Sequence, residues 1–183
     1  MQKKIKNFER PNYIIYLESS RLLLRNILPE DKDFIINLWT NSDITKYMGG
    51  SRDRNKMTLA VEENINDPFQ DEYDLWILVD KSNRSPIGHC GLLKKDVEGI
   101  EEIEVIYVIN KKFWGNGYAT EIANMLINYA FEEKKINSII ALIKPQNKAS
   151  EKVAINIGMK LEKEVIRQEN IKMLLYRKEN DTK

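Results

Sequence analysis

Lys112-Phe-Trp-Gly-Asn-Gly-Tyr-Ala-Thr-Glu121 is the stretch that decides the fold. It follows a strand-like apolar run at 103–109 and opens a helix that we predict to end near Lys134. A helix start carries unpaired N–H groups and a partial positive charge, and glycines let an anion approach the backbone closely. Lys112 adds a positive charge just before the glycines. Two interpretations stay open: a cradle for a pyrophosphate, or a tight turn without a ligand.

This loop does not match the common nucleotide-binding motifs. It lacks the Gly-Lys-Ser/Thr ending of the NTPase phosphate loop and the third glycine of the dinucleotide fold. The strand before it ends a predicted antiparallel meander, whereas a dinucleotide fold needs a parallel βαβ unit. Any phosphate bound here therefore belongs to another class of ligand.

Working outward from this loop, apolar periodicity predicts a mixed sheet with helices on its faces, an α/β (α+β) fold. The order is β-α-α-β-β-β-α-β-α-β-β, after a short edge strand at 13–17. We treat residues 1–12 as a polar arm and 13–183 as one domain. The expected strands are 21–27, 73–79, 86–93, 103–109, 138–143, 159–166 and 171–177, and the expected helices are 30–40, 55–66, 118–134 and 147–157.

Composition narrows the class of protein. The chain has 183 residues, 42% of them hydrophobic, which suffices for a sizeable core. Its 29 basic and 28 acidic residues give a net charge of +1, which argues against binding to nucleic acid through many phosphates. One cysteine and one histidine exclude an intrachain disulfide and a thiolate metal cluster. Since no membrane-length apolar run or signal peptide is evident, we expect a cytoplasmic protein without a metal or a membrane partner.

Four segments, in this order, resemble the GNAT superfamily of N-acetyltransferases, and within it the RimJ/RimL-like branch. The resemblance covers about residues 17 to 177. It implies a GNAT fold with a mostly antiparallel sheet, a splayed strand pair that holds CoA, acetyl-CoA as the donor and an amine as the acceptor. The segments are Arg21-Leu-Leu-Leu-Arg25, Glu104-Val-Ile-Tyr-Val-Ile109, Phe113-Trp-Gly-Asn-Gly-Tyr-Ala-Thr-Glu121 and Asn147-Lys-Ala-Ser-Glu-Lys-Val-Ala-Ile-Asn-Ile-Gly158.

The resemblance assigns the donor site residue by residue. Backbone N–H groups of the glycine loop would hold the CoA pyrophosphate, and the strand backbone around Val108 and Ile109 would bind the pantetheine arm. Lys112 departs from the Arg or Gln that is usual in the family, keeping the charge but losing the fork geometry of arginine. The expected CoA-binding residues are Val108, Ile109, Lys112, Trp114, Gly115, Asn116, Gly117, Tyr118, Ala119, Thr120 and Asn147.

Glu104 lies on the strand at 103–109, whose two faces are both largely apolar, so we expect a central strand. Its carboxylate is either a solvated acid beside Glu101 and Glu102 or a base in a cleft. An alkyl amine is largely protonated near neutral pH, and a carboxylate can accept its proton. In many GNAT enzymes an acid on this strand has that role.

The helix after Asn147 supplies the other candidates. Asn147 is a favoured N-cap and, by the resemblance, also a contact of the pantetheine arm. Many GNAT enzymes place a Tyr four residues before the glycine that ends this helix, but Ala154 stands there. Ser150 is therefore our candidate for protonating the leaving thiolate, with water as the alternative.

From Met57 to Asp80 the chain contains acidic residues and no Lys or Arg. This stretch is either a solvated face or an acidic wall that attracts a cationic acceptor. We therefore predict direct acetyl transfer in a ternary complex to a primary amine, either a small cationic amine or a protein N-terminus. The alternatives are a non-catalytic CoA-binding module and an NTP-binding protein. The sequence leaves the oligomeric state open, with a homodimer as one option.

Overall fold

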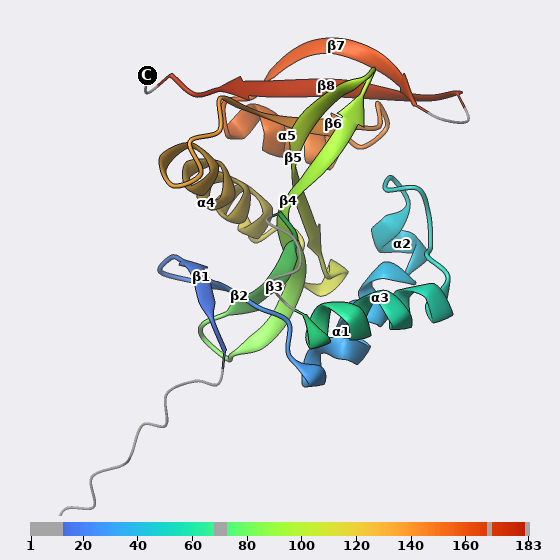
Figure 1. Ribbon diagram of the computed structural model, residues 1–183, viewed down its shortest axis with the longest axis vertical. Helices are drawn as coiled ribbons and strands as arrows, with labels where there is room; N and C mark the ends of the chain where they lie inside the picture. The colour runs from blue at the N-terminus through green and yellow to red at the C-terminus, as the bar shows by residue number, and fades with distance from the viewer. Residues whose placement is uncertain (1–12, 68–72, 168–169, 182–183) are drawn as a thin grey trace, which may run out of the picture.

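The computed structural model describes residues 13–67, 73–167 and 170–181, so the predicted arm at 1–12 lies outside the described residues. One eight-stranded mixed sheet carries helices on both faces (Figure 1), and the predicted fold class is confirmed. In chain order the elements are β1 (Ile15–Glu18), β2 (Leu22–Arg25), η1 (Pro29–Asp31), α1 (Lys32–Trp39), α2 (Ser42–Thr45), α3 (Arg54–Asn66), β3 (Leu75–Asp80), β4 (Ser85–Val97), β5 (Ile100–Ile109), η2 (Lys111–Phe113), α4 (Tyr118–Glu132), β6 (Ser138–Ile143), α5 (Lys148–Asn156), β7 (Lys160–Arg167) and β8 (Ile171–Glu179).

The strand order is β1-β2-β3-β4-β5-β6-β8-β7. Neighbouring strands are antiparallel except β5 and β6, which are parallel and share a single register pair, Glu104 with Ile140. By contrast, β4 and β5 pair along ten residues of each strand, from Gly88–Ile109 to Val97–Ile100. The sheet therefore opens between β5 and β6 beyond Glu104, as the predicted splayed strand pair requires.

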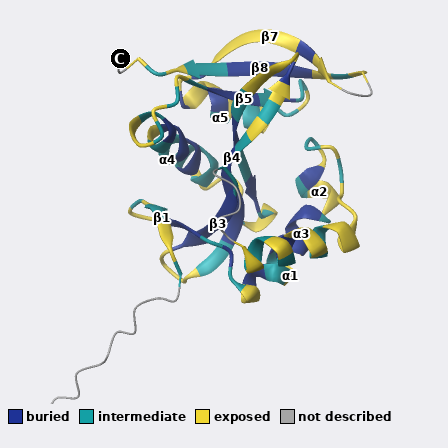
Figure 2. Ribbon diagram, in the orientation of Figure 1, coloured by how far each residue is buried: buried dark blue, intermediate teal, exposed yellow. Residues whose placement is uncertain are grey.

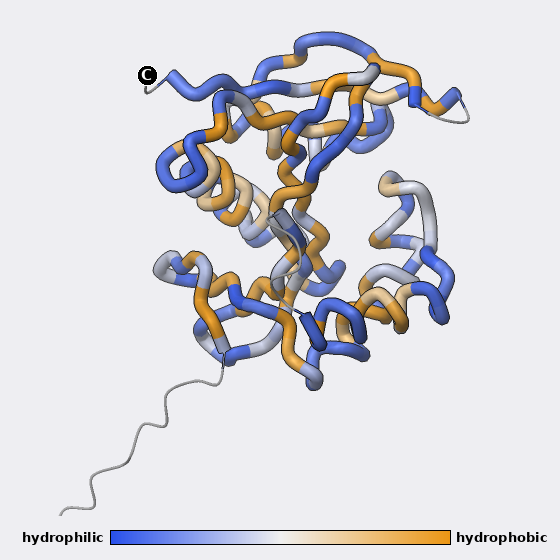
Figure 3. Tube along the Cα trace, in the orientation of Figure 1, coloured by the Kyte–Doolittle hydropathy of each residue, from blue (hydrophilic) through white to orange (hydrophobic). Residues whose placement is uncertain are grey.

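Two apolar layers cover the sheet because its central strands are apolar on both faces. Val105 and Ile109 of β5 pack in the layer under α4 and α5, whereas Val108 packs in the layer under α1 and α3. Figure 2 shows buried residues concentrated in the central strands and α4, and Figure 3 shows the same segments as the apolar part of the chain. In the part of the chain that the structure describes, no helix combines the length and apolarity needed to cross a membrane.

The helix α2 and the β4–β5 hairpin are among the features that differ from the sequence prediction. The four-residue helix α2 was not expected. It begins at Asn41, whose side chain accepts hydrogen bonds from the backbone N–H groups of Asp43 and Ile44. The β4–β5 hairpin extends about four residues further than predicted, to a turn at Glu98 and Gly99. The sequence pattern missed this extension because its residues are largely polar and show no apolar alternation.

Candidate active site

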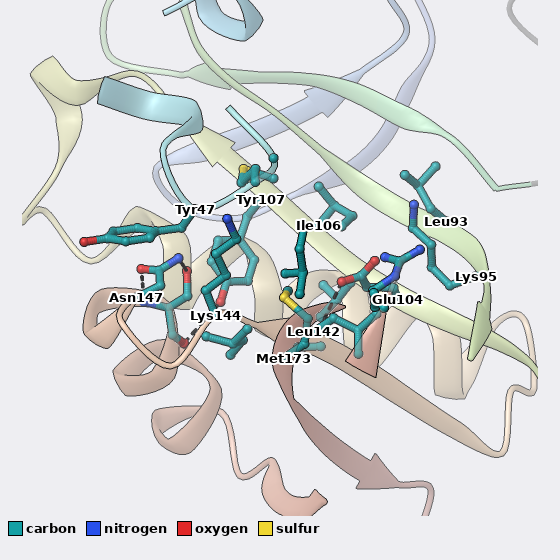
Figure 4. Close-up of a pocket in the computed structure, with 18 of the residues that line it drawn as sticks. Tyr47, Leu93, Lys95, Glu104, Ile106, Tyr107, Leu142, Lys144, Asn147 and Met173 are labelled. Atoms are coloured by element: carbon teal, nitrogen blue, oxygen red, sulfur yellow. Dashed lines mark hydrogen bonds between the residues drawn. The ribbon is translucent and has the colours of Figure 1, made fainter. Parts of the chain in front are cut away.

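A cavity of about 580 Å³ opens between β5 and β6 where the two strands diverge (Figure 4). Its walls come from both strands, from the start of α5, from the segment between α2 and α3, and from β4, β7 and β8. The lining includes three predicted site residues, Glu104, Asn147 and Ser150. Figure 4 shows Glu104 and Asn147 at opposite ends of the cavity. The predicted base and the predicted thiolate-protonating group therefore share one space.

Glu104 is buried, with 6% of its surface exposed, so the solvated-acid alternative does not hold. Its Oε1 accepts a hydrogen bond of 3.1 Å from the backbone N–H of Leu142 on β6. Burial raises the pKa of this carboxyl, while the Leu142 N–H and the charges of Lys95 and Arg167 oppose that rise. A carboxyl with a raised pKa in a cavity is suited to accept a proton near neutral pH.

Asn147 and Ser150 form a hydrogen-bonded pair at the start of α5. Asn147 Oδ1 accepts from the Ser150 backbone N–H at 3.2 Å, and Asn147 Nδ2 donates to Ser150 Oγ at 2.9 Å. Asn147 is thus the N-cap of α5, as predicted.

Tyr107 on β5 was not predicted as a site residue. Its hydroxyl donates to the Ser150 carbonyl at 3.4 Å, and burial raises its pKa to about 12.

The glycine elbow, residues 114–117 between η2 and α4, has the left-handed backbone that its sequence favours. Gly115 has φ of 80° and Gly117 has φ of 77°, where a side chain is disfavoured. The first hydrogen bond of α4 runs from the Glu121 N–H to the Gly117 carbonyl, so the N–H groups of the three residues in between have no acceptor within the helix. A Cβ placed on Gly115 would have no atom within 4 Å apart from those of Gly115 and its two chain neighbours, so the elbow is open to an approaching anion.

Side chains hold the elbow in this shape. Asn116 Nδ2 donates to the Phe113 carbonyl at 3.1 Å and to the Trp114 carbonyl at 3.3 Å. Trp114 is half exposed, and its Nε1 donates to the Ile109 carbonyl at 2.8 Å. Lys112 is exposed beside the elbow, where its charge is available to a phosphate.

Arg21 also belongs to the elbow, although it lies about 95 residues away in sequence. Its Nη1 donates to the Asn116 carbonyl at 3.1 Å, its guanidinium pairs with Glu121, and it lies 4.8 Å from the centre of the Tyr118 ring. The segment Arg21–Arg25 is predicted as part of a strand and carries part of the family resemblance, but no local sequence pattern links it to the glycines. The structure therefore places a second cation, paired with Glu121, beside the elbow.

The other predicted CoA residues lie outside the cavity. On β5 the described cavity lining ends at Tyr107, and Val108 and Ile109 are buried beyond it. The Ile109 carbonyl already accepts from Trp114. Tyr118, Ala119 and Thr120 form the first turn of α4 and are half buried.

The expectation of an acidic wall is wrong for the residues that the structure describes. None of the described acidic residues between 57 and 80 lines the cavity. Glu62 pairs with Lys32 instead, and Asp80 accepts a hydrogen bond from the Tyr118 hydroxyl at 3.0 Å. Asp71 and Glu72 lie outside the described residues. The described part of this stretch therefore gives no support for a cationic acceptor.

Cys90 and His89 on β4 are structural. Cys90 is fully buried, and burial raises its pKa to about 12, so its thiol is protonated at neutral pH. Trp39 Nε1 donates to His89 Nδ1 at 3.0 Å, and His89 Nε2 lies 3.1 Å from the Leu75 carbonyl. A neutral ring with its proton on Nε2 satisfies both contacts. In the described chain no three His, Cys, Asp or Glu side chains group closely enough to hold a metal ion.

This buried His89 makes stability depend on pH. Burial lowers the pKa of His89 from 6.5 to about 4. The unfolded chain therefore binds a proton at His89 below about pH 6.5, whereas the folded chain binds it only below about pH 4. Acidification from about pH 7.5 to 4.5 should therefore lower the free energy of unfolding by roughly 2 to 3 kcal/mol through this group. Urea denaturation of the wild type and His89→Gln measures it. The variant should lose less stability over this range, and equal losses would contradict the assignment.

Comparisons with known proteins agree with this geometry. The model of the acetyltransferase (GNAT) domain family matches residues 21–160. An uncharacterized protein of Bacillus subtilis, YkkB, is 32% identical over 165 residues, which is 90% of this chain and 95% of that protein. An uncharacterized N-acetyltransferase of Bacillus licheniformis, p20, is 29% identical over 155 residues, covering 80% of this chain and 83% of that protein.

Solved structures have the same fold. An acetyltransferase (GNAT family) from Bacillus anthracis superposes with a TM-score of 0.77 at 25% identity, covering 92% of this chain and 99% of that one. A spermidine N-acetyltransferase from Vibrio cholerae, solved with CoA and spermine, gives a TM-score of 0.73 at 18% identity and covers 88% of this chain and 97% of that one. At that identity the second similarity bears on the fold alone.

Proposed function

Because this chain belongs to the GNAT family of acetyltransferases, we propose that it moves an acetyl group from acetyl-CoA directly to a primary amine in a ternary complex. The observation that carries the proposal is a buried carboxylate, Glu104, in a cavity between two diverging strands. The acceptor is a small-molecule amine or a protein N-terminus. Acetyl-CoA supplies the acyl group as a reactive thioester.

The donor would be held at two places. The N–H groups of residues 115–119 and the charges of Lys112 and Arg21 suit a pyrophosphate, whereas the Trp114 N–H already donates to the Lys111 carbonyl. The β5 backbone near Val108 and Ile109, together with Asn147, would hold the pantetheine arm. A backbone N–H of β5 at the opening would polarise the thioester carbonyl. These positions fit the donor because the elbow is open and the strands are parted.

Within the cavity, Glu104 would take a proton from the ammonium group of the acceptor, directly or through water. The freed nitrogen then bonds to the thioester carbon, and as the carbon–sulfur bond breaks the nitrogen gives its surplus proton to water to form the neutral amide. The Ser150 hydroxyl gives its proton to the departing sulfur and regains one from water. Much of the rate gain comes from positioning amine and thioester together.

Ser150→Ala is expected to lower kcat roughly 10-fold and to leave the KM for acetyl-CoA near its wild-type value, since water replaces the hydroxyl only in part. Ser150→Thr, which keeps a hydroxyl, is the matched control and should retain most activity. Steady-state kinetics with a thiol-release assay give both numbers. Wild-type kcat in Ser150→Ala would assign thiolate protonation to water.

Three further parts of the proposal follow from the sequence. We place the enzyme in the RimJ/RimL-like branch on the four segments described above. Residues 13–183 would act as one acetyltransferase domain. A free, buried Cys90 and the near-neutral charge are consistent with the cytoplasm.

A homodimer is one option for the oligomeric state. Gel filtration of the purified protein would distinguish a monomer from a homodimer.

A two-stage experiment tests the function. Thermal shift with CoA, acetyl-CoA and ATP comes first, and we expect stabilisation by the two CoA compounds and not by ATP. An acetylation screen over polyamines, amino acids, simple alkylamines and peptides follows. Stabilisation by CoA without turnover on any amine would favour the non-catalytic CoA-binding module instead.

A further inference from the structure

The charges that line the cavity are unbalanced. Four cationic side chains, Arg52, Lys95, Lys144 and Arg167, face the space that contains one carboxylate, Glu104. No other charged side chain is part of the described lining. The cavity wall is therefore positive around a single acid, the opposite of the acidic wall that was one of the two interpretations of the sequence.

Three strands bring the central charges together. Lys95 comes from β4, Glu104 from β5 and Arg167 from the end of β7, and the charges of Lys95 and Arg167 both act on Glu104. Figure 4 shows Lys95 and Glu104 on the same side of the cavity. Glu104 nevertheless accepts its hydrogen bond from the Leu142 N–H and not from either cation. The cations are thus near the predicted base without being paired to it.

Several cations elsewhere on the described surface pair with carboxylates. Lys94, the neighbour of Lys95 on the opposite face of β4, pairs with Glu101 at 3.2 Å, and Lys148 pairs with Glu151 at 2.7 Å. Lys95, Lys144 and Arg167 form no ion pair with any residue that the structure describes. Arg52 donates to the Met48 carbonyl at 2.8 Å through one of its nitrogens. Positive charge is thus concentrated where an acceptor would bind.

This distribution discriminates between acceptors. A polyamine would bring a second ammonium group against a positive wall, and like charges in an interface are unfavourable. A carboxylate or phosphate would be attracted instead, and a guanidinium can bind either group through two parallel hydrogen bonds. The amine of the same molecule would then lie at Glu104.

Given the acetyl transfer proposed above, we propose that the acceptor is a small molecule carrying a carboxylate or phosphate close to its reacting amine, with Lys95 and Arg167 as the residues that bind the anion. The cavity of about 580 Å³ has the size of small-molecule sites in proteins, and the donor arm shares it. Amino acids and aminoalkyl phosphates have this chemistry.

The test compares acids with uncharged analogues of the same size. Amino acids are assayed against their amides, aminoalkyl phosphates against the matching amino alcohols, and spermidine is included as a polyamine. A peptide pair, Ser-Asp-Gly and Ser-Asn-Gly, reports on protein N-termini. We expect the acids to have the higher kcat/KM, and added salt to reduce that advantage. Thermal shift of the protein–CoA complex with each compound gives a readout independent of turnover.

Three variants locate the anion site. Lys95→Met and Arg167→Gln should each reduce the acid-to-amide ratio of kcat/KM roughly fivefold. Lys94→Met, on the opposite face of the same strand, should leave the ratio unchanged. Arg167 is exposed, so its variant should fold even if a change at Lys95 lowers stability.

The possible failures are distinguishable. Turnover of amines without preference for acids, a preference for spermidine, or a ratio insensitive to both variants would overturn the anion site and leave the acetyl transfer intact. Faster acetylation of Ser-Asp-Gly than of every small molecule would overturn the small-molecule acceptor. CoA binding with no turnover on any amine would overturn the transfer itself and the anion site with it.

Discussion

Glu104→Gln should reduce kcat/KM for the amine roughly 100- to 1,000-fold, because it removes the proton acceptor and keeps the shape of the side chain. The Gln side-chain carbonyl can still accept the Leu142 N–H, so the contact between β5 and β6 survives. Exposed Glu101→Gln, on the same strand, is the matched control and should retain full activity. Initial rates with saturating acetyl-CoA measure the loss. A variant within about threefold of wild type would contradict the assignment.

The pH profile of the same reaction gives a second readout. Burial raises the pKa of Glu104. At mildly acidic pH, Glu104 is therefore protonated, and the enzyme inactive, in a larger fraction of molecules than if this carboxyl had the ordinary pKa of Glu. Wild-type kcat/KM should therefore rise with pH through a midpoint above the usual Glu range. In Glu104→Gln this rise of kcat/KM with pH should disappear. An unchanged rise would assign the titration to another group.

Gly117→Ala should raise the Kd for CoA roughly 10-fold or more, because a side chain at the left-handed elbow disturbs the N–H groups that would bind the pyrophosphate. Backbone strain alone would lower stability by about 1 kcal/mol. Gly99→Ala is the matched control, because Gly99 has φ of 83° and open space around its Cβ position in the β4–β5 turn.

Isothermal titration with CoA and thermal unfolding of both variants separate the two effects. Both variants should lose a similar amount of stability, and only Gly117→Ala should bind CoA more weakly. Equal CoA affinity in the two variants would show that the elbow does not bind the donor.

The sequence predicted features that depend on local pattern. The glycine elbow was recognised because a strand, two close glycines and a helix follow one another within one short stretch. Glu104 was recognised as a lone acid on an otherwise apolar strand. The N-cap role of Asn147 followed from a residue preference at the start of a helix. Each of these needs only neighbours along the chain.

Features that depend on tertiary partners were missed. Lys94 and Lys95 are identical side chains in adjacent positions, and only the register of β4 against β5 decides which one faces the cavity. Arg21 reaches the elbow through the fold alone. The acidic residues between 57 and 80 suggested an acidic wall of the acceptor site, but a count of charges does not show that Glu62 pairs with Lys32. Charge patterns in sequence therefore predict a site less well than backbone patterns do.

The single residue pair between β5 and β6 has a consequence for how the molecule avoids unwanted association. A break in the middle of a sheet exposes two new rows of backbone donors and acceptors, and exposed strand edges invite other chains to add to them. Here the two rows diverge from their one shared residue pair and border the cavity of about 580 Å³, which has the size of a small-molecule site. Under the proposed function, the arm of CoA, a slender chain with its own amide groups, would enter there and take the place of a missing strand.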